Sequence, residues 1–122
     1  MERAIPILPI DDPERAKEFY VEGLGFQVLF EASYPADPGA GSIIGLERGN
    51  ARLHLDAPMP GHGRDACVYL DVKDADALYQ EWQSKVEIRK PPVNQAWGAR
   101  TFDVIDPFGN TLFVVGPAGD NQ

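Results

Sequence analysis

The sequence contains one cysteine, Cys67, and no long run of hydrophobic residues. A single cysteine excludes an internal disulfide, which is typical of proteins that work in a reducing compartment such as the cytoplasm. No stretch approaches the roughly 20 apolar residues that a transmembrane helix needs, so we expect no membrane partner. The N-terminus lacks a basic start followed by an apolar run, and we therefore expect no secretion signal.

Basic residues are also scarce. Lysine and arginine together number 11, against 19 aspartates and glutamates, which gives a net charge of −8. A protein that binds nucleic acid needs a basic face to displace counterions from phosphates. Here Arg89 and Lys90 form the one adjacent basic pair, so we expect no nucleic-acid partner. The acid excess either attracts cationic partners or simply keeps the protein soluble.

What the sequence does have is an ordinary globular composition, with 43% hydrophobic and 25% charged residues in a chain of 122 residues. That length predicts a single domain, 1–122, with a core of its own. Gly-Asn occurs at 49–50 and at 109–110, each time before a short apolar run. This dipeptide between strands is typical of a tight hairpin turn. Because the two copies lie half a chain apart, we expect two similar halves.

Each half has the same predicted order: one strand, one helix and three further strands. The first helix begins at Asp12, as N-cap, and at Pro13, and it ends at Gly23. The second helix begins after Asp74, and its apolar residues up to Trp82 have the spacing of a helix that packs on a sheet. The predicted strands are 5–10, 26–31, 42–46, 51–56, 67–72, 86–89, 101–105 and 111–115.

This order predicts an α+β fold of two βαβββ modules, the first at about 4–56 and the second at about 66–116. The segment 57–65 is rich in proline and glycine and is the predicted linker. The segment 33–41 is a predicted long loop inside the first module. His62 falls in the linker, where we expect an exposed loop histidine.

Alternation along 51–56 predicts which side chains face a cleft. Arg52, His54 and Asp56 share one face, and the apolar residues between them face the helix. On the cleft face His54 either contacts a ligand or transfers a proton, or else a polar neighbour such as Asp56 satisfies it.

The strand 67–72 has a corresponding row, formed by Cys67, Tyr69 and Asp71. Cys67 is a nucleophile if its thiol loses its proton readily. Otherwise it is a small buried hydrophobic residue.

These features resemble the vicinal oxygen chelate superfamily, which includes glyoxalases, bleomycin resistance proteins and dioxygenases. The sequence is most similar to bleomycin resistance proteins, in its Ala-x-Pro-x-Leu opening, its Trp-Gly pair and its Asp-Pro-x-Gly-Asn motif. The resemblance implies that the two modules form curved, mixed sheets around a cleft. The segments that carry it are AIPIL (4–8), FYVEGLGF (19–26), GNARLHL (49–55), DADALYQEW (74–82), WGARTF (97–102) and DPFGN (106–110).

The resemblance also bears on metal binding. Metal-dependent members hold a divalent ion with four side chains, whose positions correspond here to Ile5, His54, Cys67 and Phe113. Ile5 and Phe113 have no donor atom, and a catalytic ion usually takes three protein ligands. We therefore expect no metal, no other cofactor and no enzymatic activity. An atypical metal shell around His54 and Cys67 is the alternative.

Bleomycin resistance proteins sequester a cationic drug with a heteroaromatic tail, without chemistry, and the resemblance implies a small-molecule binder of this type. Aromatic rings on the predicted cleft strands suit such a ligand. Trp97 either stacks on the ligand or plugs a loop, and Arg100 either orients an anionic group or pairs with Asp103 or another surface acid. The predicted ligand-binding residues are Phe30, Tyr34, His54, Asp56, Cys67, Tyr69, Trp97, Arg100 and Phe113.

Two other functions stay open: a metal-dependent enzyme of the glyoxalase or dioxygenase type, and a relative that binds a metabolite. Bleomycin resistance proteins have a proline at the position of Pro6, where the N-terminal strand crosses to the partner subunit. The resemblance therefore implies a homodimer with the same crossing. Alternatively, Pro6 and Pro9 merely mark the two ends of an edge strand within one chain.

Overall fold

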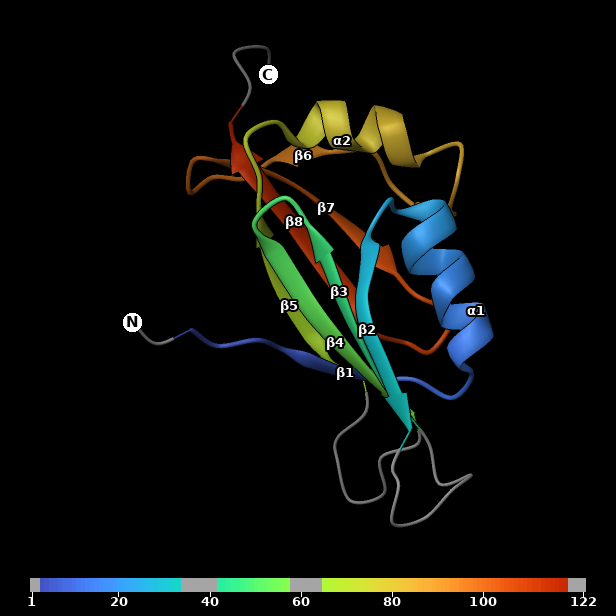
Figure 1. The fold of residues 1–122 in the computed structure, drawn as a ribbon. Coiled ribbons are helices and arrows are strands. Elements are labelled where there is room, and N and C mark those ends of the chain that lie inside the picture. The colour runs from blue at the N-terminus through green and yellow to red at the C-terminus, as the bar shows by residue number, and fades with distance from the viewer. Residues whose placement is uncertain (1–2, 34–41, 58–64, 119–122) are drawn as a thin grey trace.

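The first module folds into a four-stranded sheet, the first sheet, in the order β1-β4-β3-β2 (Figure 1). The computed structural model describes residues 3–33, 42–57 and 65–118. β1 (Ile7–Pro9) runs parallel to β4 (Ala51–Ala57). β3 (Ser42–Arg48) lies antiparallel to β4 and to β2 (Gln27–Ser33). Two residues discussed above, Tyr34 and His62, lie outside the described residues, as does most of the predicted linker.

The helix of the first module begins where the sequence predicts. The Asp12 carboxylate accepts hydrogen bonds from the backbone N–H groups of Glu14 and Arg15, and α1 (Pro13–Lys17) has its proline in the first turn. The helix continues as a π-helical segment, η1 (Glu18–Gly23), which ends at the predicted glycine. None of the described helices is long and apolar enough to cross a membrane.

The second module repeats this topology in a second sheet, ordered β5-β8-β7-β6. The helix α2 (Ala75–Trp82) begins at Asp74, whose carboxylate accepts a hydrogen bond from the Ala77 N–H at 3.0 Å. As in the first module, the strands that come first and last along the chain, here β5 and β8, pair in parallel, and the other pairs are antiparallel. The strands are β5 (Cys67–Asp71), β6 (Val93–Asn94), β7 (Ala99–Ile105) and β8 (Thr111–Pro117).

One predicted strand is wrong. The segment 86–89 is not a strand, and the sheet gains its fourth strand only at β6, which pairs with Thr101 and Arg100. Val86 and Ile88 alternate inward and pack against the core, which explains the strand-like pattern. Pro91 and Pro92 follow, and because proline has no N–H to give to a ladder, pairing resumes only beyond them.

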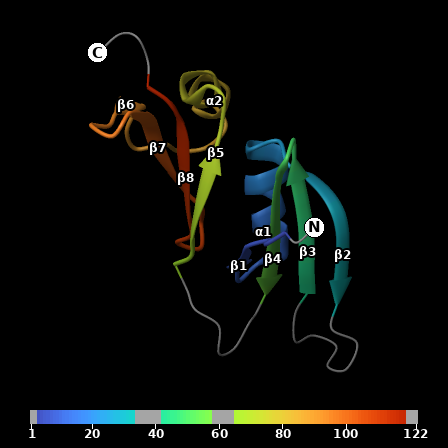
Figure 2. The same ribbon diagram turned by 90° about the vertical axis from the view of Figure 1, so that its left-hand side faces the viewer.

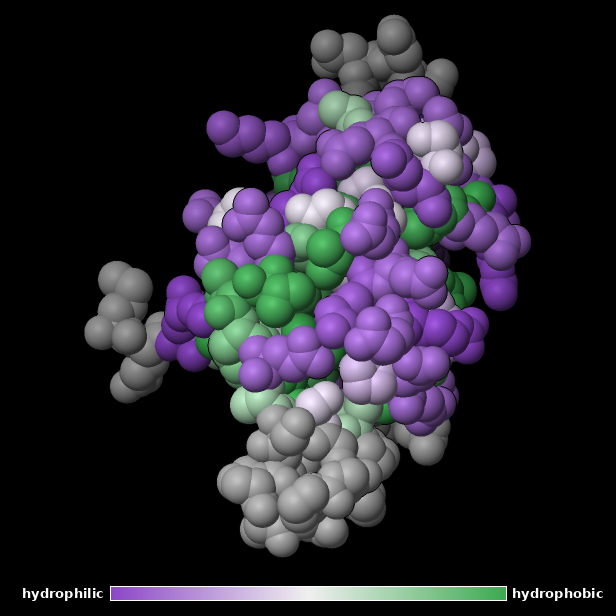
Figure 3. Space-filling view, turned by 45° about the vertical axis from the view of Figure 1, so that its right-hand side comes forward, coloured by the Kyte–Doolittle hydropathy of each residue, from purple (hydrophilic) through white to green (hydrophobic). Residues whose placement is uncertain are grey.

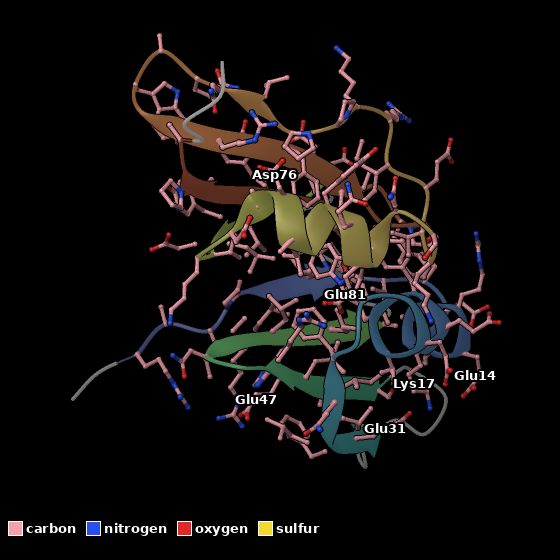
Figure 4. The ribbon with its side chains drawn as sticks, turned by 90° about the horizontal axis from the view of Figure 1, so that it is seen from above. Glu14, Lys17, Glu31, Glu47, Asp76 and Glu81 are labelled. Atoms are coloured by element: carbon pink, nitrogen blue, oxygen red, sulfur yellow. The ribbon has the colours of Figure 1, made fainter. Side chains whose placement is uncertain are left out.

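The two modules share one hydrophobic core. Side chains from the helices and from the inner sheet faces of both modules form a single buried cluster, which includes Tyr20, Leu53, Trp82 and Phe102. Figures 2 and 4 show the two sheets on opposite sides of the molecule, with α2 between them. The other side of each sheet is not covered by a helix, and we call these sides the first and second free faces.

Polar contacts join the modules at two places. The Tyr20 hydroxyl donates a hydrogen bond to the Asp106 carboxylate at 2.6 Å, and both side chains are buried. At the other place Arg48 donates a hydrogen bond to the Leu24 carbonyl at 2.8 Å. It also donates two hydrogen bonds to the Glu81 carboxylate, each at 2.9 Å. Glu81 points from α2 toward the first module (Figure 4).

Candidate ligand-binding site

The first free face has the side chains that alternation along β4 predicts. Arg52, His54 and Asp56 lie on it, while Leu53 and Leu55 point inward and are fully buried. Asp56 is only 2% exposed. In the parallel register, His54 lies beside Ile7 of β1, and Ile7 is exposed.

Phe30 reaches this face through an irregularity in β2. The register between β2 and β3 shifts between Val28 and Phe30, so that Phe30 lies opposite Gly45. The ring covers this glycine, and a Cβ atom at position 45 would overlap it. The ring then meets His54 edge-on, with centroids 5.2 Å apart and planes at 90°. Because Gly45 has no side chain, the Phe30 ring can lie directly over the backbone at this position.

The bulge also leaves three consecutive hydrophobic residues of β2, Val28, Leu29 and Phe30, exposed. Ile7 of the same sheet is exposed as well. Figure 3 shows a green hydrophobic area on the side of the molecule that it draws. An apolar area that stays in contact with water marks a surface suited to a ligand or another protein.

Two nitrogen atoms on the first free face are buried without a hydrogen-bond partner among the described residues. They are Nε2 of His54 and Nε of Arg52. Burial lowers the pKa of His54 below its ordinary value of 6.5, and the nearby positive charge of Arg52 lowers it further. Both effects favour the neutral imidazole. The structure does not give Nε2 the polar partner that one interpretation of the sequence expected.

The second free face has its own aromatic pair. Tyr69 of β5 and Phe113 of β8 are opposite each other in the register, and their rings meet edge-on at 5.9 Å. Tyr69 is 59% exposed. Cys67 lies on the same face and is exposed, so its interpretation as a small buried hydrophobic residue is wrong. The thiol is a free one that a ligand can reach.

Two acidic residues flank this aromatic pair. Asp71 follows Tyr69 on the same face of β5, and Asp103 of β7 lies directly opposite Phe113. Both are exposed. Asp103 is not among the predicted ligand-binding residues, although its place two residues before the exposed Ile105 on the same strand puts it on the outer side.

Trp97 lies at the rim of the second sheet, in the turn between β6 and β7. Its side chain is 59% exposed in the single chain. A residue this exposed does not plug a loop, so that alternative is not what the structure shows. Trp97 is free to contact a ligand or a second chain.

Arg100 lies on the helix side of β7, not on the second free face. Its Nε donates a 2.8 Å hydrogen bond to Asp76 of α2, and its Nη1 donates one to Asn94 at 3.2 Å. The acid it pairs with is therefore a surface acid other than Asp103. Arg100 lies two and four residues before Phe102 and Val104, which both point into the core. Alternation along the strand therefore predicts that Arg100 is on the inner side.

The structure thus divides the predicted site into two groups. Phe30, His54 and Asp56 belong to the first sheet, and Cys67, Tyr69 and Phe113 belong to the second. Between the modules lies a groove of about 810 Å³. Its lining includes the core residues Leu53, Val68 and Trp82. Arg52 and Tyr69, one from each free face, also line it. Arg52 and the groove were absent from the predicted set.

The residues at the four metal positions do not fit a metal ion. Two of them, Ile5 and Phe113, have no donor atom. The other two, His54 and Cys67, lie on different sheets. Among the described residues, no group of three or more histidine, cysteine, aspartate or glutamate side chains is placed to hold a metal.

A family model described as "Glyoxalase superfamily protein" matches residues 1–117. The chain belongs to the glyoxalase superfamily. The strand order, with two βαβββ modules and parallel first and last strands in each, is the fold that the resemblance implied, and this prediction is confirmed. No curated protein matches the chain.

Several solved structures share the fold over nearly the whole chain. A bleomycin-binding protein in complex with bleomycin is 25% identical, with a TM-score of 0.75, over 97% of this chain and 100% of that one. The bleomycin-binding protein from Streptomyces verticillus, in complex with copper(II)-bleomycin, is 28% identical, with a TM-score of 0.73, over 97% and 98%. An antibiotic-binding protein from Streptomyces sp. CB03234 is 25% identical, with a TM-score of 0.74, over 97% and 98%.

Proposed function

We propose that this protein is a cytoplasmic small-molecule binder that performs no chemistry on its ligand. It holds a heteroaromatic ligand between aromatic side chains of the two free faces. The observation that carries this proposal is the pair of accessible ring contacts, Phe30 with His54 and Tyr69 with Phe113. His54 and Phe113 occupy equivalent places, because each lies on the last strand of its module beside a residue of the first strand. Flat rings at both places suit a planar ligand.

The charges of the second free face favour a ligand with a cationic group. Asp71 and Asp103 lie beside Tyr69 and Phe113. A cation near these rings gains from their negative faces and from the two carboxylates. The similar proteins named for bleomycin or antibiotic binding support a ligand of this kind.

A second copy of the chain completes the site in this proposal. The two free faces belong to sheets on opposite sides of one molecule (Figure 2). A ligand that contacts both ring pairs, Phe30–His54 and Tyr69–Phe113, therefore needs the first free face of one chain and the second free face of another. The exposed hydrophobic residues of both faces, among them Ile7, Leu29 and Ile105, supply apolar area for such an association.

The crossing of the N-terminal strand at Pro6 belongs to the same proposal. In one chain the Pro6 carbonyl accepts a hydrogen bond from the His54 N–H at 2.9 Å. The described residues before Pro6 run outward from β1 (Figure 1). In an exchanged dimer we expect the same backbone bond to form between the two chains.

Binding of bleomycin, followed by calorimetry and by the rise in melting temperature, tests the proposed function. We expect the Tyr69→Ala variant to lose affinity and the Gln80→Ala variant, changed on an exposed part of α2, to keep it. A panel of planar heteroaromatic amines extends the test if bleomycin itself is not the ligand. The proposal fails if no aromatic compound binds, or if Phe30→Ala and Tyr69→Ala bind as tightly as the unchanged protein.

Light scattering at micromolar concentration tests the assembly. We expect a mass near twice the 13.4 kDa of one chain. A mass near 13.4 kDa would remove the second copy from the proposal. Elemental analysis that finds about one divalent ion per chain would instead favour a metal-dependent enzyme.

A further inference from the structure

Most of the described lysine and arginine side chains that are partly buried form ion pairs with carboxylates. Lys17 lies between Glu14 and Glu31, at 3.2 and 3.1 Å (Figure 4). Two partly buried arginines each bind a carboxylate of α2. Arg48 pairs with Glu81 at 2.9 Å, and Arg100 pairs with Asp76 at 2.8 Å.

Arg52 is the exception among the described residues. It is partly buried, its Nε has no hydrogen-bond partner, and no carboxylate forms an ion pair with it. Glu47 of β3 lies opposite it in the register, but the ion pairs of the described residues do not include these two side chains. Native proteins seldom bury a charged donor without an acceptor, so the Nε–H of Arg52 indicates a partner that the described residues do not supply.

A second unpaired nitrogen lies two residues along the same strand. His54 Nε2 is buried without a partner, and its ring touches Phe30. Residues 52 and 54 lie on the same face, roughly 7 Å apart along β4. The carboxylate on this row, Asp56, is four residues from Arg52, at the far end of the row and buried. The near end of the first free face therefore offers two nitrogen donors, a flat ring and Ile7.

We propose that Arg52 and His54 bind an anionic group of the ligand, a carboxylate or a phosphate, while the aromatic part that bears this group rests on Phe30. This inference rests on the proposed function, since it assigns the chemistry of one half of the same site. The planar guanidinium presents Nε–H and Nη–H in the geometry that both anions accept. A neutral imidazole donates from Nε2, or takes up a proton beside the anion.

The ligand class that follows is an aromatic compound with a single acidic group at one end. The second free face, with Asp71 and Asp103 near Tyr69 and Phe113, receives the other end, which is neutral or cationic. The net charge of −8 disfavours a polyanion, because the long-range field of the protein repels it. One acidic group at a local positive site is compatible with that field.

Four small probes of similar size separate the possibilities: benzoate, phenyl phosphate, benzyl alcohol and benzylamine. NMR of the histidine rings reports on binding, with His62 as the second histidine of the chain. We expect benzoate or phenyl phosphate to shift the His54 signals and to raise the pKa of His54, because a negative charge nearby favours the protonated imidazole. We expect benzyl alcohol and benzylamine to leave that pKa unchanged.

Variants assign the effect to the residues. Arg52→Gln should weaken anion binding by roughly 10-fold or more, the range for a charge-assisted hydrogen bond. Arg52→Lys keeps the charge but loses the planar set of N–H donors, and it should give an intermediate affinity. Arg89→Gln, which removes an exposed arginine elsewhere, should bind as the unchanged protein does. His54→Gln provides a second test if Arg52→Gln does not fold.

The outcomes distinguish the inference from the proposed function. If neither anion shifts His54, or if Arg52→Gln and His54→Gln both bind the anions normally, the inference is wrong. If at the same time benzylamine or a heteroaromatic amine binds in a way that Tyr69→Ala abolishes, the proposed function stands without it. If the His54 pKa is already raised in the ligand-free dimer and anions do not change it, a group of the second chain occupies the place, which also overturns the inference.

Discussion

Tyr20 and Asp106 are buried partners from different modules, joined by a hydrogen bond of 2.6 Å between the phenol and the carboxylate. Asp106 also accepts bonds from the backbone N–H groups of Phe108 and Asn110 and from the Asn110 amide. That amide in turn donates to the Pro9 carbonyl, at the end of β1. One buried carboxylate thus fixes the turn before β8 and, through Tyr20 and Asn110, ties it to the first module.

Tyr20→Phe should therefore lower the free energy of unfolding by about 1.5–3 kcal/mol, the range for a hydrogen bond to a charged group. Burial and the charge of Asp106 both raise the pKa of Tyr20, so the phenol stays protonated and can donate at any ordinary pH. Urea unfolding measures the loss. Tyr79→Phe, at a partly buried tyrosine whose ring packs on Phe102, is the control. Equal stability of the two variants would mean that the Tyr20–Asp106 bond contributes nothing.

The Arg48–Glu81 contact predicts a specific dependence of stability on pH. Hydrogen bonds from Arg48 are the main cause that lowers the pKa of Glu81 below its ordinary value of 4.5, although burial opposes them. A lowered folded-state pKa stabilises the protein above the unfolded-state pKa, and this contribution is lost as the pH falls through the folded-state value.

Because Glu81 is half exposed, we expect Glu81→Gln to reduce stability at pH 7 by no more than about 1 kcal/mol. The difference between the variant and the unchanged protein should shrink below pH 4.5. Urea unfolding at a series of pH values measures it. A difference that is the same at neutral and at acid pH would contradict the role of this carboxylate.

Gly45→Ala should disturb the first free face. The added methyl group overlaps the Phe30 ring, so the ring must move or the strands must part. Overpacking of this kind costs about 1–3 kcal/mol. The double variant Gly45→Ala/Phe30→Ala removes the clash and should recover stability, but not ligand affinity. If Gly45→Ala alone is as stable as the unchanged protein and binds ligand equally well, Phe30 does not need this place.

The two tryptophans of the chain report on different environments. Trp82 is buried and donates to the Leu24 carbonyl at 3.0 Å, whereas Trp97 is exposed. Trp82→Phe leaves Trp97 as the one indole, and we expect its fluorescence to change on ligand binding. Trp97→Ala should weaken binding by about 1–3 kcal/mol, the range for a stacking residue. Unchanged fluorescence and affinity would remove Trp97 from the site.

Local sequence patterns predicted the local structure well. Asp74 and the apolar spacing up to Trp82 fixed α2, and alternation along β4 placed Arg52, His54 and Asp56 on one face. These features depend on neighbours within a few residues. The strand expected at 86–89 failed because inward-facing residues alternate there without a partner strand.

Contacts between distant segments were beyond such patterns. The bulge that brings Phe30 over Gly45 depends on the register of two strands, and the bond between Tyr20 and Asp106 joins residues 86 positions apart. The pairing of Arg100 with Asp76 depends on how α2 packs beside β7, which the charge of Arg100 alone does not predict. The division of the site between two sheets follows from how the modules pack, which no single motif encodes.

The most direct test of the account is a binding titration on mixed dimers. One chain has its first free face impaired by Phe30→Ala and His54→Ala, and the other has its second free face impaired by Tyr69→Ala and Phe113→Ala. If each site joins the first free face of one chain to the second free face of another, both homodimers bind weakly, while the mixed dimer regains one intact site. The account predicts that mixing the two variants restores tight binding. A mixture that binds only as the sum of its two components would contradict it.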